Sequence, residues 1–340
     1  MKIPTPHSEW RESLGVIDVH THLAIDRLPD AIRLMEQNGL EMLIDISARF
    51  GEDFTAFLQA ASAYPGRFAA FTGLDFRDFG EPGWAKRECD HLERAVEQGA
   101  VGFKIHKSLG LERRDSAGRL IPVDDERLAP LFEKAAELNC VVAMHIADPK
   151  AFFIPLNEKN ERWDELKHNP HWWFGDRTQH PYDWWRLIRQ LEKVVRRHPR
   201  TTIMGVHFGC AAEEIGYVAD VMRDHPNYIV DIAARVPELG RHEPAFVREI
   251  FTEFQDRILF GTDLGIRRNI MLGSPQPFEP QDADVAKFYQ AHWLYFETSL
   301  EQIAHPTPIQ GNWKIDAVDL PRQVLAKLYA DNARRLLLKK

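Results

Sequence analysis

Two histidines separated by one residue, His20 and His22, are the first feature of this sequence that could do chemistry. Side chains alternate along an extended chain, so residues i and i+2 point the same way and can bind one ion. Imidazole suits zinc, manganese or iron, and a carboxylate ligand adds charge and hard character. A metal that is held by three or more protein ligands and keeps one open position lowers the pKa of its bound water to about 7. One such pair among 15 histidines can arise by chance, so the spacing needs support from further ligands.

Further candidate ligands stand at the ends of other short apolar runs, which we interpret as strands. They are Lys104 and His106, His145, His207 and Asp263. Each alone has a simpler interpretation: a packed or surface histidine, a lysine paired with a buried carboxylate, or an aspartate capping a helix. Their joint placement at strand ends favours one shared metal site.

The elements that would position these residues follow a regular order. Eight apolar runs alternate with eight segments of helical periodicity. The expected strands are 16–20, 42–46, 68–74, 101–105, 140–145, 202–207, 228–232 and 257–262. The expected helices are 28–38, 53–64, 85–98, 124–138, 182–198, 212–224, 244–254 and 322–338. Parallel neighbouring strands need a helical crossover, so the pattern predicts an α/β fold, and eight units favour a closed (β/α)8 TIM barrel.

The length of 340 residues exceeds the roughly 250 of a plain barrel. Two segments account for the excess, 146–181 after strand five and 264–320 after strand eight. We therefore expect a single domain over 1–340 with large insertions at these two places, both on the carboxyl-terminal face where barrel active sites lie. Segment 146–181 is rich in aromatic residues. It is either a subdomain that packs on itself or on a neighbouring subunit, or a lid that offers an aromatic wall to a substrate.

Composition excludes several classes of protein. The net charge of −8 disfavours a surface for duplex nucleic acid, which needs clustered Lys and Arg. The three cysteines lack zinc-ribbon spacing and cannot form a closed disulfide set, which fits a reducing compartment. The chain has no run of about 18 apolar residues, and its polar, proline-broken start is not a secretory signal. We expect a cytoplasmic protein with neither nucleic acid nor membrane as partner.

Six segments resemble, in order, the metal-dependent amidohydrolase superfamily and within it the amidohydrolase 2 branch. They are Val16–His22, Gly99–His106, Val142–His145, Val206–Gly209, Phe260–Asp263 and Tyr329–Leu337. The resemblance covers nearly the whole chain. It implies a distorted (β/α)8 barrel that holds one or two divalent metals, with zinc the first expectation and manganese or iron as alternatives. Pairing through loops is common in this fold, so a homodimer is a further expectation.

The resemblance also implies roles for the candidate ligands. His20, His22 and Asp263 would bind the more buried metal. His145 and His207 would bind a second metal; in one-metal members His145 would join the first site, while His207 holds water or substrate.

Lys104 lies where some two-metal relatives have a carboxylated lysine that bridges both ions. In this sequence either Lys104 or His106 could reach the mouth of the barrel, and many members of the branch have no bridge. We expect Lys104 to be a metal ligand and His106 to be a substrate-binding residue.

The first functional hypothesis is hydrolysis of an amide, lactone or ester bond, with a metal-activated water as the nucleophile. Asp263 would take the proton of the water and pass it to the leaving group, and His207, if it is not a ligand, would stabilise the oxyanion. Arg235, after strand seven, would bind a carboxylate of a small substrate.

Two alternatives remain open. Similar ligands serve metal-dependent non-oxidative decarboxylases of the same superfamily, and released carbon dioxide would identify that reaction. A non-catalytic barrel could also retain the metal for stability or for binding a partner; a metal without an open coordination position would indicate it.

Overall fold

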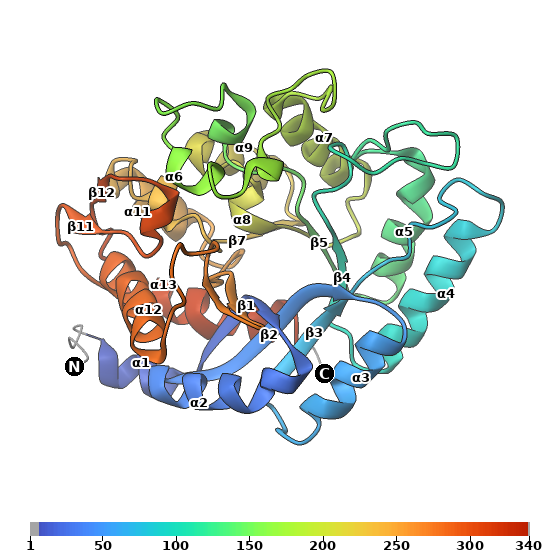
Figure 1. The fold of residues 1–340 in the computed structure, drawn as a ribbon. Coiled ribbons are helices and arrows are strands. Elements are labelled where there is room, and N and C mark those ends of the chain that lie inside the picture. The colour runs from blue at the N-terminus through green and yellow to red at the C-terminus, as the bar shows by residue number, and fades with distance from the viewer. Residues whose placement is uncertain (1–6, 339–340) are drawn as a thin grey trace.

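The computed structural model describes residues 7–338, in which parallel strands form the centre and helices surround them (Figure 1). The strands are β1 (Val16–Leu23), β2 (Leu40–Arg49), β3 (Phe68–Thr72), β4 (Gly102–Ile105), β5 (Val141–Met144), β6 (Ile203–Gly205), β7 (Tyr228–Asp231) and β8 (Ile258–Leu259). They lie in chain order, and each pairs in parallel with the next.

The last strand returns to the first. The Val19 N–H donates to the Phe260 carbonyl at 2.9 Å, and the Asp263 N–H donates to the His20 carbonyl at 2.9 Å. A short strand, β9 (Leu264–Ile266), continues the pairing with β1 and is followed by β10 (Ile270–Leu272). The predicted α/β barrel class is therefore confirmed.

Helices lie where the periodicity predicted them. The bounds are α2 (Leu28–Asn38), α3 (Glu52–Ala61), α4 (Trp84–Glu97), α5 (Ala129–Glu137), α7 (Trp184–Arg197), α9 (Ile215–Asp224) and α11 (Pro244–Glu253), with the last one divided into α13 (Arg322–Ala326), a π-helical turn (Lys327–Asp331) and α14 (Asn332–Leu336). One shorter helix near the start, α1 (Ser8–Leu14), was not predicted. The first six residues of the polar start discussed above lie outside the described range.

The two long segments are structured. Segment 146–181 contains three short helical turns: Lys150–Phe153, α6 (Trp163–Leu166) and Pro170–Trp172. Segment 264–320 contains β9, β10, the short β11 (Ile303–Ala304), β12 (Lys314–Ile315) and a 16-residue helix, α12 (Asp282–Glu297), that packs beside α2 (Figure 1). This helix was not predicted, although its buried residues Val285, Phe288, Tyr289, Trp293 and Phe296 recur at helical spacing. That both segments are insertions stays a prediction.

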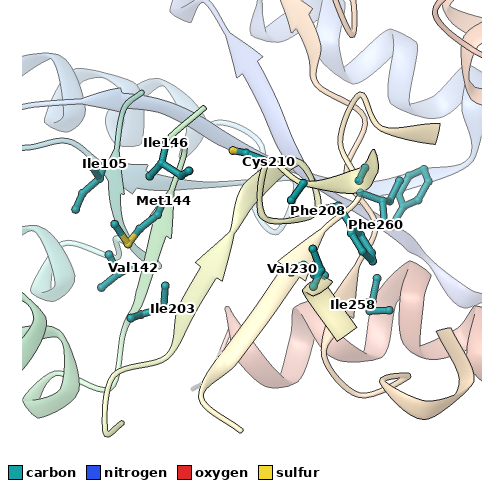
Figure 2. Packing of buried hydrophobic residues seen from close by; sticks show 14 of the residues in the cluster. Ile105, Val142, Met144, Ile146, Ile203, Phe208, Cys210, Val230, Ile258 and Phe260 are labelled. Atoms are coloured by element: carbon teal, nitrogen blue, oxygen red, sulfur yellow. The ribbon is translucent and has the colours of Figure 1, made fainter. Parts of the chain in front are cut away.

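The core has two layers, one on each face of the strands. The inner layer fills the barrel with alternate strand residues: Ile17, Val19, Ile44, Ile46, Phe71, Val141, Ala143, Met204, Val206, Ile229 and Leu259. Ala333 and Leu337 join it from the C-terminal helical segment. The intervening residues, among them Ile105, Val142, Met144, Val230 and Phe260, belong to the outer layer beneath the helices (Figure 2). This packing holds the strand ends that carry the polar residues.

No helix within residues 7–338 has both the length and the apolar character needed to span a lipid bilayer.

Candidate metal centre

The strand ends bring His20, His22 and Asp263 together at the mouth of the barrel. The Nε2 atom of His22 lies 3.1 Å from Oδ1 of Asp263, and the Nε2 atom of His20 lies 3.7 Å from the same oxygen. One ligand atom from each of the three residues lies within 4.8 Å of the others. Three of the residues predicted as ligands, separated by more than 240 positions, therefore lie close enough together to hold a metal ion.

A change of register in β1 turns both histidines inward. Below the mouth, Ile17 and Val19 face the barrel interior, whereas at the mouth His20 and His22 face it. This switch from odd to even positions requires a bulge, and the pairing of β1 with β2 shifts register between Asp18 and Thr21. The spacing of the two histidines was informative, but the orientation of the pair depends on this bulge.

Hydrogen bonds fix which nitrogen of His20 and His22 faces the site. His20 Nδ1 lies 2.9 Å from Oδ2 of Asp231, so Nδ1 carries the proton and donates it. His22 Nδ1 lies 3.1 Å from the hydroxyl oxygen of Ser47, whose own proton goes to Asp45. Ser47 must therefore accept from Nδ1. Both rings consequently present a lone pair on Nε2, as metal-binding histidines do when a second group orients them.

His207 and His145 complete the ring of imidazoles. His207 donates from Nδ1 to the Ala233 carbonyl at 2.8 Å, which leaves a lone pair on its Nε2. Its ring centre lies 4.6 Å from that of His20 and 4.5 Å from that of His145. Burial lowers the pKa values of His145 and His207 well below the ordinary value, and it also lowers that of His22. Neutral rings are the form that binds metals.

The residues present fit a divalent cation. Oδ1 of Asp263 and Nε2 of His145 are buried and have no hydrogen-bond partner among the described residues. The short contact between His22 and Asp263 lacks hydrogen-bond geometry, and it sets a nitrogen lone pair against a carboxylate oxygen. Buried lone pairs that face one another repel unless a cation lies between them. Nitrogen ligands with one carboxylate suit zinc, manganese or iron.

Lys104 faces the same space from β4 and is 4% exposed. Burial lowers its pKa to about 8, although the nearby carboxylates of Asp231 and Asp263 favour the charged form. For Asp263 itself, burial acts to raise the pKa, but neighbouring groups outweigh it, namely the imidazoles of His22 and His20 when they are protonated and the ammonium of Lys104, and the pKa is lowered. The acid is therefore ionised at neutral pH.

A cavity of about 540 Å³ opens above these ligands, and two predicted substrate-binding residues line it. Arg235 is 4% exposed; it donates to the Ala234 carbonyl, and its Nε has no hydrogen-bond partner among residues 7–338. His106 is exposed, with its ring centre 6.0 Å from that of His145. The structure thus places both residues at the mouth without assigning them a role.

Segment 146–181 supplies an aromatic wall to this cavity through Phe152, Trp172 and Phe174. Other residues of the segment anchor it. The side chain of Arg162 is fully buried and pairs with Glu165 and with Glu238 of α10 (Val236–Leu239). Both interpretations of the segment stay predictions; the structure shows that Phe152 and Phe174 are buried and also line the cavity.

Sequence reasoning missed Asp231, the residue that orients His20. Its Oδ1 also accepts from the backbone N–H of His207 and of Ala233, at 2.8 and 3.1 Å. Asp231 is the last residue of β7, so the signal that found the other residues, a polar side chain at a strand end, also applied to it. Both of its carboxylate oxygens accept these bonds, which gives it a supporting position; Asp231 also forms a second group with His20 and His207, whose ligand atoms lie within 4.8 Å of one another.

Solved structures share this fold at low identity. They include a 2,6-dihydroxybenzoate decarboxylase from Rhizobium (16% identical, 95% of this chain and 98% of that chain, TM-score 0.54) and a dihydroxybenzoic acid decarboxylase from Polaromonas with bound manganese and the inhibitor 2-nitroresorcinol (15%, 95% and 97%, 0.55). A third is a 4-oxalomesaconate hydratase from Rhodopseudomonas palustris (13%, 95% and 95%, 0.54). No curated protein matches the sequence.

The family assignment follows from the sequence match and the mouth of the barrel together. The family model Amidohydro_2, described as amidohydrolase, matches residues 17–338, a range that includes every predicted ligand. The same residues hold the buried ring of histidines and the carboxylate. This chain belongs to the amidohydrolase family of metal-dependent enzymes.

Proposed function

We propose that this protein is a metal-dependent hydrolase that cleaves an amide, lactone or ester bond in a small carboxylated substrate. The observation that supports this proposal is the set of inward lone pairs: Nε2 of His20, His22 and His207, with Oδ1 of Asp263. Each histidine has its other nitrogen engaged, so the set is prepared for a cation and not for a hydrogen-bond network.

The metal would be held by His20, His22 and Asp263, with His145 and His207 completing one site or forming a second. When bound, a divalent cation supplies Lewis acidity, which lowers the pKa of water and polarises the electrophile. We propose zinc as the metal, with manganese and iron as alternatives. Lys104 is proposed as a further ligand in a two-metal form, because its lowered pKa makes the neutral amine accessible near pH 8.

Asp263 is the proposed general acid–base. Its carboxylate is ionised and buried, and Oδ1 is not engaged by a hydrogen bond, so it can accept a proton from the attacking water and return it to the leaving group. The geometry favours His207 as a ligand over an oxyanion donor, because its proton lies on Nδ1 and is used by Ala233. A donor role would require a protonated ring, which burial disfavours.

Arg235 is the proposed anchor for the substrate carboxylate. The guanidinium is buried beside the cavity with a free N–H, and a carboxylate there would accept a charge-assisted hydrogen bond. The aromatic wall opposite suits an aromatic ring or an apolar chain on the same substrate. His106 at the rim would contact the exposed end of the ligand.

Metal analysis and product analysis together test the proposal. We expect the purified protein to contain a divalent metal, to lose activity on lactones, amides or esters after chelation, and to regain it with zinc or manganese. Hydrolysis in ¹⁸O-labelled water must place the label in the product. Carbon dioxide release without label would instead establish a decarboxylase, the activity named for two of the structural neighbours.

A substitution at Arg235 tests the substrate class. We expect Arg235→Ala to raise KM for carboxylated substrates about 10-fold or more and to leave neutral analogues of the same size unaffected. Arg267→Ala is the matched control, because Arg267 also lines the cavity but already contacts Ser47. Equal effects of Arg235→Ala on both substrate classes would remove Arg235 from the proposed role.

A further inference from the structure

A buried carboxylate, Asp18, ties together the two chain segments that carry the metal ligands. Its Oδ1 accepts from the backbone N–H of His20 at 3.2 Å and from that of Thr262 at 3.1 Å. Its Oδ2 accepts from the Thr262 hydroxyl at 2.5 Å and from the Tyr289 hydroxyl at 2.8 Å. Asp18 precedes His20 by two residues, and Thr262 precedes Asp263 by one, so one side chain links both ligand-bearing segments.

This link supports the bulge that turns His20 inward. A bulge leaves a backbone N–H outside the strand ladder, and a buried N–H without a partner is costly. Asp18 accepts the N–H of His20 at this register shift and therefore satisfies it locally. The space is tight on the opposite side, because a Cβ at Gly261 would lie 2.8 Å from the Cβ of His20. Small movements of either segment would alter the distance between the ligands.

Tyr289 brings the third anchor from outside the barrel strands. It belongs to α12, in segment 264–320, and is 1% exposed. Its ring stacks on Trp293 with centres 5.8 Å apart and planes at 21°, so the hydroxyl is held in place by packing. The hydroxyl reaches Asp18 and does not line the cavity. Tyr289 can therefore act on the site through Asp18 and through Thr262, with which its hydroxyl also interacts.

We propose that Tyr289 is a positioning residue for the metal centre, acting through Asp18 and Thr262 to hold His20 and Asp263 at ligand spacing. This inference rests on the proposed metal-dependent function. It also gives segment 264–320 a role, because α12 supports the floor of the site from behind the strands.

The test compares two tyrosines on the same helix. Tyr289→Phe removes the hydroxyl that contacts Asp18, whereas Tyr295→Phe removes a buried hydroxyl that has no hydrogen-bond partner among the described residues. We expect Tyr289→Phe to weaken zinc affinity of the full-length protein about 10- to 100-fold, measured by competition with a chelating indicator. Tyr295→Phe should bind zinc as the wild type does. Melting temperatures of the metal-free proteins serve as the measure of a purely structural effect.

The outcomes separate this inference from the proposed function. Unchanged zinc affinity in Tyr289→Phe, whatever its melting temperature, would overturn the positioning role and leave the hydrolase proposal standing. A wild-type protein that binds neither zinc, manganese nor iron would remove the basis of both.

Thr262 offers a second pair of variants if Tyr289→Phe does not fold. Thr262→Ser keeps the hydroxyl that donates to Asp18, and Thr262→Val removes it with little change in volume. We expect Thr262→Val to weaken zinc binding about 10-fold or more and Thr262→Ser to retain it. Equal affinities in these two variants would contradict the proposal.

Discussion

The two ends of the barrel strands use different residues for the same backbone conformation. Before the first four strands, at the amino-terminal end, the turns adopt positive φ at glycines, whereas Asn139 has a positive φ before β5. Gly15, Gly39, Gly66 and Gly99 precede β1 to β4 with φ of +75°, +71°, +76° and +112°. Glycine adopts this region without steric cost, so these turns are relaxed.

At or just after the carboxyl ends of the strands, at the mouth, five side-chain-bearing residues adopt the same region, in addition to Gly209. Ala48, His207, Phe208, Ala234 and Asp263 have φ between +52° and +64°. Each such residue costs about 1–2 kcal/mol and persists only when its surroundings hold it. Asp231 accepts from the N–H of His207, which shows how the mouth maintains one such strained turn. The comparison indicates that the turns at the amino-terminal end add little strain. At the mouth, strained residues lower the stability of the fold but orient functional side chains.

The largest expected effect at the mouth is on activity and not on folding. We expect Asp263→Asn to lower kcat about 10²- to 10⁴-fold, because the proposed proton acceptor is lost. The melting temperature of the metal-free protein should change little by comparison, because asparagine keeps the size and shape of the side chain and Oδ1 makes no hydrogen bond that would be lost. Steady-state kinetics and thermal melts measure the two effects. A variant with a much lower melting temperature but an unchanged kcat would contradict the comparison.

A substitution in the inner layer should show the opposite pattern. Leu259 is fully buried inside the barrel. We expect Leu259→Ala to lower the free energy of unfolding by about 2–5 kcal/mol, while kcat at 25 °C changes only a few-fold. Urea unfolding curves give the stability change. Loss of kcat comparable with that of Asp263→Asn would show that the two ends are not separable.

The pH dependence of stability tests a buried histidine outside the mouth, His292. Burial lowers the pKa of this fully enclosed histidine on α12 from 6.5 to about 4. Between these values the unfolded chain binds a proton that the folded chain does not, so stability is complete above pH 6.5 and is lost as the pH falls. The loss amounts to about 2 kcal/mol by pH 5. We expect His292→Leu to lose correspondingly less stability between pH 7.5 and 5 in urea unfolding; parallel curves for variant and wild type would contradict this.

The smallest effects test the backbone comparison directly. We expect Gly39→Ala to lower the free energy of unfolding by about 1 kcal/mol, because alanine is strained at φ +71°. Ala234→Gly, at φ +52°, should raise it by up to about 1 kcal/mol, because glycine relieves the same strain. Denaturant titrations of both variants provide the measurement. Changes of the same sign would show that strain does not distinguish the two ends.

The elements were predictable because their signals are local. Apolar runs such as 228–232 and stripes such as that of α2 are read over a few residues, and residue types at strand ends pointed to His20, His22, Lys104, His145, His207 and Asp263. The helix α12 was missed although its buried residues recur at helical spacing, because the whole of segment 264–320 was interpreted as an insertion. The supports Asp18 and Tyr289 were also missed, since nothing near them in sequence marks their contact.

By itself, the sequence determined the order of strands and helices, the kinds of ligands and the strand ends on which they stand. Only the tertiary structure decided that β1 changes register, that particular nitrogens face inward, and that Asp231 and Tyr289 support the site from behind. The physical reason is that periodicity and residue type act within a few residues. Ligand orientation, in contrast, depends on ring closure and on hydrogen bonds between segments more than 200 positions apart.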